Sequence, residues 1–263
     1  MYKIEGSRPV YYQFEQWSNS KAFTHAVFTR HGGVSRAEWS SLNIGGTVGD
    51  DPQAVERNLQ LSYAALELDA AKACNVWQVH SADSVVANGP MPGRRWLARA
   101  DSMVTNRHDI PLLMRFADCV PVLFYDPQHN AIGIAHAGWR GTVAQVVVNT
   151  LLAMRDAFGT DPADVQAAIG PSIGPDHYQV GPEVVAAVQQ SFGTLEGLIR
   201  YASDGSAYLN LWEANRLALE RAGVQQIEVA GLCTASNVTD FYSHRAEHGK
   251  TGRFGAVIAL RAA

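Results

Sequence analysis

The sequence has few cysteines and no long apolar run. Its three cysteines, Cys74, Cys119 and Cys233, form an odd number without the spacing of a disulfide framework, so we expect free thiols in a reducing compartment. No stretch approaches the roughly 18 uninterrupted apolar residues that a membrane-spanning helix needs. Residues 1–6 also lack the basic and then apolar layout of a signal peptide. These absences predict a cytoplasmic protein without a membrane partner.

A strong excess of one charge is absent as well. The 263 residues carry a formal net charge of −4, which gives no general attraction toward nucleic acid, so no nucleic-acid partner is expected. Residues 170–175 lack the Gly-Lys-Ser/Thr ending of a phosphate-binding loop, and nothing matches the GxGxxG dinucleotide motif. The chain has no CxxC pair and no HExxH motif, which argues against a structural zinc finger.

Short apolar runs of strand length alternate with helical patterns along the chain. Strands are expected at residues 24–29, 110–116, 120–125, 131–135, 165–169, 227–230 and 256–260. Capping residues, prolines at the first turn and terminal glycines predict helices at residues 54–66, 143–158, 183–192 and 211–222. Because no repeat, low-complexity tract or linker interrupts the pattern, residues 1–263 are expected to form a single α/β domain.

Three potential metal ligands stand at the ends of apolar, strand-like runs: His80, Cys119 and His136. Such a run is typical of a buried strand that brings one reactive group to a cleft. Two imidazoles and one thiolate, with a fourth position open, are the donor set of a catalytic zinc site. The three residues are far apart in the sequence, so the fold would have to assemble the site. The alternative is a buried free thiol with two ordinary histidines.

Several loops carry arginines that could hold an anion. Arg30 lies beside paired glycines, Arg140 follows His136, and Arg245 lies in a C-terminal segment rich in cationic groups. Paired glycines permit close approach of the backbone to a ligand, and an arginine can hold phosphate or carboxylate through two parallel hydrogen bonds. Turns and loops with solvated arginines are the alternative interpretation.

The remaining cysteines and histidines are given structural roles. Cys74 precedes a strand-like run and is expected in the core. The histidines His25, His108 and His129 are expected at the surface or in turns.

A series of motifs runs in order from about residue 20 to residue 260. It comprises Thr29-Arg30-His-Gly-Gly-Val-Ser, Ser41-Leu-Asn43, Gln78-Val-His80, Ala100-Asp101-Ser-Met-Val-Thr, Ala117-Asp118-Cys119-Val-Pro, Ala135-His136-Ala-Gly-Trp-Arg140-Gly, Ala168-Ile-Gly-Pro-Ser-Ile-Gly-Pro, Cys233-Thr and Ser243-His-Arg245, followed by Gly249-Lys-Thr-Gly-Arg253. The series resembles the laccase-domain family, which has been renamed purine nucleoside phosphorylase. The AHAGWRG and ADCVP segments are specific to that family.

The resemblance implies an α/β/β/α sandwich of mixed β-sheets. It also implies a zinc ion held by His80, Cys119 and His136. Residues implied to line the substrate pocket by motif position alone are Asn43, Gln78 and Ser243. Copper, named in older descriptions of the family, is less expected, because a multicopper oxidase needs several sites rich in histidine.

The activity implied by the resemblance is zinc-dependent phosphorolysis of purine nucleosides such as adenosine, inosine, guanosine and methylthioadenosine, with adenosine deamination as a second activity. The implied partners are a purine nucleoside and phosphate. Phosphate must be positioned beneath C1′ of the ribose, and zinc with Arg30, Arg140 or Arg245 could hold it there. Deamination would use the ability of an open zinc site to activate water. A monomer or a small homo-oligomer is expected.

The residues are also compatible with two other classes of function. A bacterial branch of the family is linked to editing of cell-wall peptide precursors, which a cysteine-type hydrolase could perform with Cys119 as nucleophile and His136 or His80 as base. A binding protein with a structural metal is the other alternative. The sequence leaves open the preferred nucleoside, the general acid or base, and the roles of His177, Asp118 and Cys233.

Overall fold

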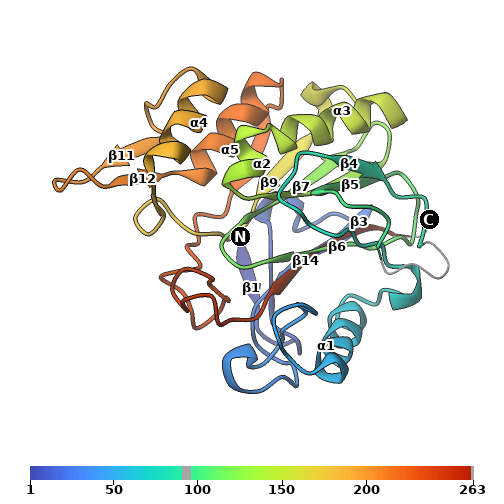
Figure 1. Ribbon diagram of the computed structural model, residues 1–263. Helices are drawn as coiled ribbons and strands as arrows, with labels where there is room; N and C mark the ends of the chain where they lie inside the picture. The colour runs from blue at the N-terminus through green and yellow to red at the C-terminus, as the bar shows by residue number, and fades with distance from the viewer. Residues whose placement is uncertain (91–95, 262–263) are drawn as a thin grey trace.

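The computed structural model describes residues 1–90 and 96–261, and the elements stack in four layers (Figure 1). Helix α1 (Pro52–Ala64) forms one outer layer, two β-sheets form the middle, and helices α2 to α5 cover the far side. The expected α/β/β/α sandwich is therefore confirmed.

The first sheet is antiparallel throughout, in the strand order β1-β2-β3-β14-β6. Its strands are β1 (Tyr2–Ile4), β2 (Tyr11–Gln13), β3 (Phe23–Phe28), β14 (Phe254–Leu260) and β6 (Leu112–Phe116). Every residue of β3 and β14 is buried, because these strands lie between α1 on one face and the second sheet on the other.

The second sheet is mixed, in the order β13-β9-β7-β8-β5-β4. Its strands are β13 (Gln226–Val229), β9 (Gln166–Ile169), β7 (Val120–Asp126), β8 (Ala131–Ala137), β5 (Ser102–Thr105) and β4 (Ser84–Val86). The two edge pairs are parallel and the inner pairs are antiparallel. Strands β7 and β8 run side by side through the centre of the molecule, so the residues at their ends meet.

The helical layer packs on the outer face of the second sheet. Its helices are α2 (Trp139–Val143), α3 (Val146–Phe158), α4 (Pro182–Phe192) and α5 (Leu211–Arg221). A small three-stranded sheet stands beside α4 and projects from the body in Figure 1. It consists of β10 (Gln179–Val180), β12 (Ala207–Leu209) and β11 (Ile199–Tyr201).

Buried apolar side chains fill the space between each pair of layers. Tyr63 belongs to the layer between α1 and the first sheet, and Phe116 and Ile134 belong to the layer between the sheets. Leu151 and Leu219 belong to the layer between the second sheet and the helices. Burial on this scale is the main favourable contribution to the free energy of folding.

The seven expected strands are all present, with small shifts at their ends. The strands that the sequence did not predict are β1, β2, β4, β5, β10, β11 and β12. These strands are only two to four residues long, so they contain no apolar run long enough to be recognised.

The helix expected at residues 143–158 is present as α3, but it begins later than expected, and Val143 belongs to the preceding helix α2. Helix α2 begins at Trp139 and ends at Val143, and α3 begins at Val146. Gln145 between them has the left-handed backbone (φ 63°), which no α-helix can contain. No glycine or proline marks this break, so the helical pattern of the sequence continued across Gln145 and placed the start of the helix too early.

The expected position of His25 was wrong. We expected a surface or turn residue, but His25 lies within β3 and is 2% exposed. Its Nε2 accepts a hydrogen bond of 2.9 Å from the backbone amide of Phe14, which satisfies the buried ring. Burial lowers the pKa of His25 to about 3, so the ring is neutral in the folded protein. His108 and His129 are exposed and Cys74 is buried, as expected.

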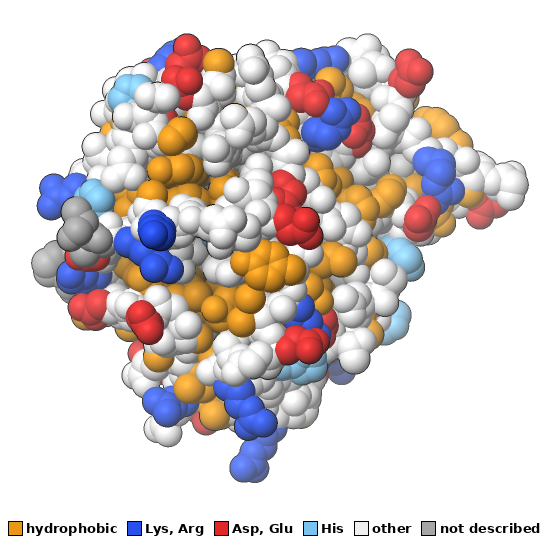
Figure 2. All heavy atoms as spheres, turned by 180° about the vertical axis from the view of Figure 1, so that it is seen from behind, with side chains coloured by type: hydrophobic (Ala, Val, Ile, Leu, Met, Phe, Trp, Pro, Cys, Tyr) orange, Lys and Arg blue, Asp and Glu red, His pale blue; other side chains and the backbone are white. Residues whose placement is uncertain are grey.

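The molecular surface carries both signs of charge. On the face shown in Figure 2, basic and acidic side chains are interspersed around a central area of apolar side chains. Among the residues that the structure describes, no helix combines the length and apolar character needed to cross a bilayer.

Candidate metal centre and substrate cavity

Cys119 and His136 meet at one end of the second sheet. Cys119 directly precedes β7, and His136 is the second-last residue of β8. The antiparallel register pairs Pro121 of β7 with His136, so the thiol and the imidazole come from neighbouring backbone positions. The close pairing of two buried strands therefore brings these two groups together.

His80 completes the group from a loop before β4. Its backbone is left-handed (φ 60°), an uncommon conformation for a residue other than glycine. Asp101 holds this loop, because its Oδ2 accepts hydrogen bonds from the amides of Val79 (3.1 Å) and Ser81 (2.6 Å). The strained loop places the imidazole of His80 with its ring centroid 4.9 Å from that of His136.

Asp101 also orients His136. Its Oδ1 lies 2.8 Å from Nδ1 of His136, and its backbone oxygen accepts a hydrogen bond of 2.8 Å from the His136 amide. The carboxylate favours a proton on Nδ1, which leaves Nε2 free to bind a ligand. This carboxylate–histidine arrangement is common behind metal-bound imidazoles.

The three side chains fit a metal ion. Their ligand atoms all lie within 4.8 Å of one another. Burial favours the neutral thiol of Cys119, but the charges and hydrogen bonds of His136 and His80 lower its pKa to about 6. Burial also lowers the pKa of His136, but Cys119 and Asp101 outweigh it and raise this pKa to about 9. A thiolate beside a cationic imidazole is an arrangement in which a metal ion can take the place of protons.

Glycine keeps the space beside this group open. A Cβ atom on Gly138 would lie 2.8 Å from Sγ of Cys119 and 3.1 Å from Nδ1 of His80. We call His80, Cys119 and His136 the donor triad from here on.

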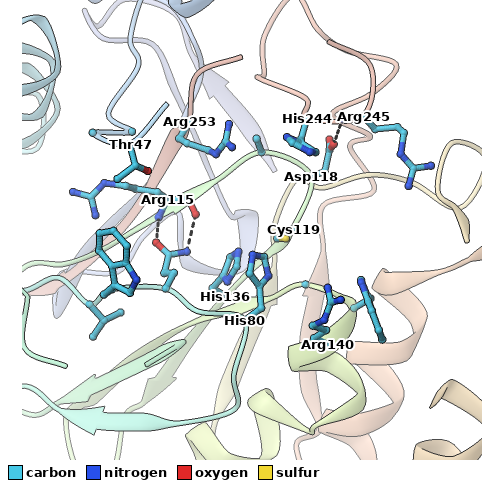
Figure 3. A pocket seen from close by; sticks show the side chains of 18 of the residues that line it. Thr47, His80, Arg115, Asp118, Cys119, His136, Arg140, His244, Arg245 and Arg253 are labelled. Carbon is cyan, nitrogen blue, oxygen red and sulfur yellow. Dashed lines mark hydrogen bonds between the residues drawn. The ribbon is translucent and has the colours of Figure 1, made fainter. Parts of the chain in front are cut away.

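The donor triad opens into a cavity of about 440 Å³, a size suited to a small organic ligand. Figure 3 shows the triad in the middle, with Arg140 and Arg245 on one side and Arg115 on the other. The cavity wall also includes Thr47, Trp77, Gln78, Trp96, Ala117, Asp118, Trp139, Tyr178, His244 and Arg253.

Arginines on one side of the cavity are stacked on aromatic rings. The guanidinium carbon of Arg140 lies 4.3 Å from the ring centroid of Trp139, and that of Arg245 lies 5.2 Å from the centroid of Tyr178. Within residues 1–90 and 96–261, the ion pairs formed by arginines involve Arg30, Arg155, Arg200 and Arg216. Arg140 and Arg245 therefore have no carboxylate partner in that part of the chain. Their charges are available to an anion in the cavity.

The opposite side of the cavity is aromatic. The rings of Trp77 and Trp96 meet edge to face with centroids 4.6 Å apart, and Trp77 is 38% exposed. Gln78 anchors this wall, since its side-chain amide donates to the backbone oxygen of Arg115 (2.8 Å) and accepts from the Arg115 amide (2.9 Å). The two sides of the cavity thus differ in chemistry: Arg140 and Arg245 lie on one side, and the tryptophan pair lies on the other side together with Arg115.

The expected site residues divide into two groups. Arg140, Arg245 and Gln78 line the cavity together with the donor triad. Arg30, Asn43 and Ser243 do not line this cavity, and other contacts explain why.

The guanidinium of Arg30 pairs with Glu247 at 3.0 Å and lies over the ring of Tyr242, with 4.4 Å between the guanidinium carbon and the ring centroid. Ser243 is fully buried, and its hydroxyl oxygen accepts a hydrogen bond from the Ala246 amide. These contacts stabilise the C-terminal loop.

Asn43 acts behind the cavity wall. Its Oδ1 accepts hydrogen bonds of 2.8 Å from the amides of both Gly45 and Arg253. These two residues line the cavity, so Asn43 joins two parts of its wall without reaching the interior.

Sequence reasoning missed the aromatic wall and Arg253. The only available signal for Arg253 was its place in the motif that ends at Gly252-Arg253. Trp77 stands next to Gln78, but an isolated tryptophan in a sequence does not reveal whether it is exposed in a cavity.

The sequence left the roles of Asp118, His177 and Cys233 open, and the structure places one of them in the cavity wall and two outside it. Asp118 lines the cavity, and its carboxylate accepts hydrogen bonds from the Thr234 hydroxyl (2.7 Å) and the Arg245 amide (2.6 Å). It therefore positions the loop that carries Arg245. His177 and Cys233 lie outside the cavity lining, with 3.6 Å between Nδ1 and Sγ.

Comparison with known proteins places the whole chain in one family. A sequence model of the family described as multi-copper polyphenol oxidoreductase laccase matches residues 24–261. A purine nucleoside phosphorylase of Bacteroides thetaiotaomicron is 36% identical, over 94% of this chain and 95% of that protein. A purine nucleoside phosphorylase of Deinococcus radiodurans is 39% identical, over 91% of this chain and 90% of that protein.

Solved structures agree with the fold. The crystal structure of YlmD from Geobacillus stearothermophilus superposes with a TM-score of 0.87 at 34% identity, covering 92% of this chain and 93% of that chain. The crystal structure of the hypothetical protein YfiH from Bacillus licheniformis gives a TM-score of 0.89 at 33% identity, covering 96% and 97%. The chain therefore belongs to the family described as multi-copper polyphenol oxidoreductase laccase, in which relatives of this chain are named purine nucleoside phosphorylase.

Proposed function

We propose that the protein is a zinc-dependent purine nucleoside phosphorylase that also deaminates adenosine. Its substrates would be purine nucleosides such as adenosine, inosine, guanosine and methylthioadenosine, together with inorganic phosphate. One observation carries the proposal: the donor triad opens into a cavity in which Arg140 and Arg245 have no carboxylate partner among the described residues. The names of the relatives support the reaction class.

The donor set favours zinc. Two imidazoles and a thiolate are ligands that zinc accepts in catalytic sites, where a fourth position stays open. When bound, the metal would supply Lewis-acid stabilisation of negative charge that develops in the cavity. The residues themselves do the rest: Asp101 fixes the imidazole of His136, and Gly138 leaves room beside Cys119.

Phosphate would bind on the cationic side. The stacked guanidinium groups of Arg140 and Arg245 are held on Trp139 and Tyr178, so little side-chain entropy is lost when they bind an anion. The purine would lie against Trp77 and Trp96, because aromatic rings favour stacking with a planar base. The ribose would then lie between the two sides, near the donor triad.

In phosphorolysis, a phosphate oxygen forms a bond to C1′ of the ribose while the bond from C1′ to N9 of the purine breaks. The products are ribose 1-phosphate and the free base, which takes up a proton. In deamination, water adds at C6 of adenosine and ammonia leaves, which produces inosine. The protein contributes positioning of the reactants and a cationic environment for the phosphate.

A cysteine-type hydrolase is the second candidate, and one observation favours it. Cys119, His136 and Asp101 have the order of contacts of a nucleophile, a base and an orienting carboxylate. His80 on the other side of Cys119 favours the metal site, because a hydrolase needs only one imidazole at the thiol. A metal-bound thiolate would be a poor nucleophile, so the two functions compete for Cys119.

Copper oxidase chemistry has less support. A multicopper oxidase needs several groups of copper ligands. In the described part of the chain, the donor triad is the single group of three or more His, Cys, Asp or Glu residues whose ligand atoms come together.

The test is metal analysis followed by assay with adenosine and phosphate. We expect about one zinc per chain in the purified protein and its loss in Cys119→Ala, because the thiolate is one of three donors. Cys233→Ala is the matched control, since Cys233 lies outside the cavity lining, and it should keep the metal. Full zinc occupancy in Cys119→Ala would contradict the metal assignment.

Product analysis separates the candidate functions. Adenine with ribose 1-phosphate indicates phosphorolysis, and inosine indicates deamination. If the zinc-loaded protein forms neither product while iodoacetamide inactivates cleavage of a cell-wall peptide by the metal-free protein, the hydrolase takes the place of the phosphorylase.

A further inference from the structure

Tyr178 lines the cavity, and its hydroxyl group makes no hydrogen bond to the residues that the structure describes. The residue is half-buried and lines the cationic side. A tyrosine hydroxyl that is shielded from bulk water usually finds a polar partner. A free hydroxyl on a cavity wall is therefore a candidate contact for a bound molecule.

The backbone of Tyr178 is fixed at two points. Its amide donates to the oxygen of Gly174 (3.1 Å), and its own oxygen accepts a hydrogen bond from the amide of Leu209 in β12 (3.0 Å). These bonds join the loop to the small sheet, so the ring is presented from a defined position and not from a loose loop.

The same segment holds Arg245. The guanidinium lies over the Tyr178 ring, and its Nη1 donates to the backbone oxygen of Gln179 (3.0 Å). A guanidinium held on an aromatic face and by a carbonyl still has N–H groups that can donate hydrogen bonds to a ligand. The ring of Tyr178 thus aligns one of the two arginines on the cationic side.

Burial of the hydroxyl keeps it protonated, so it can act as a hydrogen-bond donor. Burial raises the pKa of Tyr178, the negative charges of Cys119 and Asp118 raise it further, and Arg245 and Arg140 oppose the rise. The hydroxyl therefore keeps its proton at neutral pH. Arg140 and Arg245 line the same cavity as Tyr178, and Arg245 lies over its ring.

We propose that Tyr178 is a substrate-contacting residue that donates its hydroxyl hydrogen to the phosphate held by Arg140 and Arg245. This inference rests on the proposed phosphorylase function. A proton donor beside two cations without carboxylate partners is best matched by an anionic oxygen, because such charge-assisted hydrogen bonds are the stronger kind. The hydroxyl keeps its proton throughout, so its role is binding and positioning.

The test compares Tyr178→Phe with Tyr208→Phe in the zinc-loaded protein. Tyr178→Phe removes only the hydroxyl and keeps the ring beneath Arg245. Tyr208 is the matched control, because the Arg200 guanidinium carbon lies 4.6 Å from its ring centroid and Tyr208 does not line the cavity. Zinc content and circular dichroism of both variants check that the fold and the donor triad are intact.

Binding of inorganic phosphate alone is measured by isothermal titration calorimetry. We expect the dissociation constant for phosphate to rise about tenfold in Tyr178→Phe and to stay unchanged in Tyr208→Phe. In the nucleoside assay, KM for phosphate should rise by a similar factor while KM for the nucleoside stays constant. A residue with only a structural role would not separate the two KM values.

The outcomes distinguish this inference from the proposed function. Weaker phosphate binding in Tyr178→Phe supports the inference even if no nucleoside is cleaved, in which case the phosphorylase proposal alone fails. Equal phosphate binding in Tyr178→Phe and the wild type overturns the inference. Absence of phosphate binding in the wild type overturns it as well.

Discussion

At the scale of single residues, Gly138 controls the space around the donor triad. Its backbone (φ −71°, ψ 173°) can be adopted by any residue, so no conformational demand requires glycine there. The demand comes from the neighbours, because a Cβ atom would lie 2.8 Å from Sγ of Cys119 and 3.1 Å from Nδ1 of His80. A methyl group at this position must displace a donor atom.

We expect Gly138→Ala to weaken zinc binding by about 10- to 100-fold, the effect usual for disturbance of the groups around metal ligands. Competition with a chromophoric chelator measures the affinity. Gly6→Ala is the control, because a Cβ on Gly6 would have no atom within 4 Å. Equal zinc affinity of Gly138→Ala and Gly6→Ala would show that the donor atoms adjust without cost.

At the scale of elements, helix α1 supports the cavity through one buried side chain. Asn58 is fully buried, and its Nδ2 donates to Ser35 Oγ (2.8 Å), to the Ser41 oxygen (3.2 Å) and to the Asn43 oxygen (2.8 Å). Its Oδ1 accepts from the Val34 amide (2.9 Å). The helix therefore ties together the loop that contains Asn43, which in turn holds the cavity wall.

Asn58→Ala should destabilise the fold by about 3 kcal/mol, since it leaves several buried polar groups without a partner. Urea denaturation measures the free energy of unfolding. Gln60→Ala on the same helix is the control, because Gln60 is exposed and its loss should change stability by less than about 0.5 kcal/mol. A similar small effect in Asn58→Ala would mean that water replaces these hydrogen bonds.

Helix boundaries were predictable where a capping side chain or a terminal glycine marks the end of the helix. Asp51 accepts a hydrogen bond from the Gln53 amide at the start of α1, and Gly159 and Gly193 end α3 and α4 in left-handed conformations. The break at Gln145 carried no such signal. It is held by a tertiary contact, the hydrogen bond of 2.8 Å from the Gln145 side chain to Ser191 of α4.

At the scale of the whole molecule, His25 links stability to pH. It is buried in a central strand of the first sheet, so protonation of its ring requires the surrounding layers to open. Its pKa is about 3 in the folded state against 6.5 for an exposed histidine. A lowered pKa means that the unfolded chain binds the proton more readily, so protonation favours unfolding.

The contribution of His25 is complete above pH 6.5 and is lost as the pH falls from 6.5 toward 3. Between pH 6.5 and pH 4.5 we expect the free energy of unfolding to fall by about 2 to 3 kcal/mol more in the wild type than in His25→Gln. Urea denaturation of both proteins at the two pH values measures this difference. Parallel changes in the two proteins would contradict the assignment to His25.

What the sequence by itself determined was the donor triad and the class of fold. His80, Cys119 and His136 each end an apolar run or lie close to one, which marked them as candidates, and the family motifs around them selected the metal site over a buried free thiol. The long strands β7 and β8 were also predictable from the sequence, because strands buried on both faces need continuous apolar runs.

Only the tertiary structure decided which other residues share the cavity. Arg30 stands in a motif but pairs with Glu247, whereas Trp77 and Tyr178 stand outside any obvious pattern and line the cavity. The wall is built from loops and strand ends of both sheets, brought together by contacts such as the bond from the Arg253 amide to Asn43. Such contacts join residues distant in sequence, and packing of the layers sets their geometry, which no local pattern records.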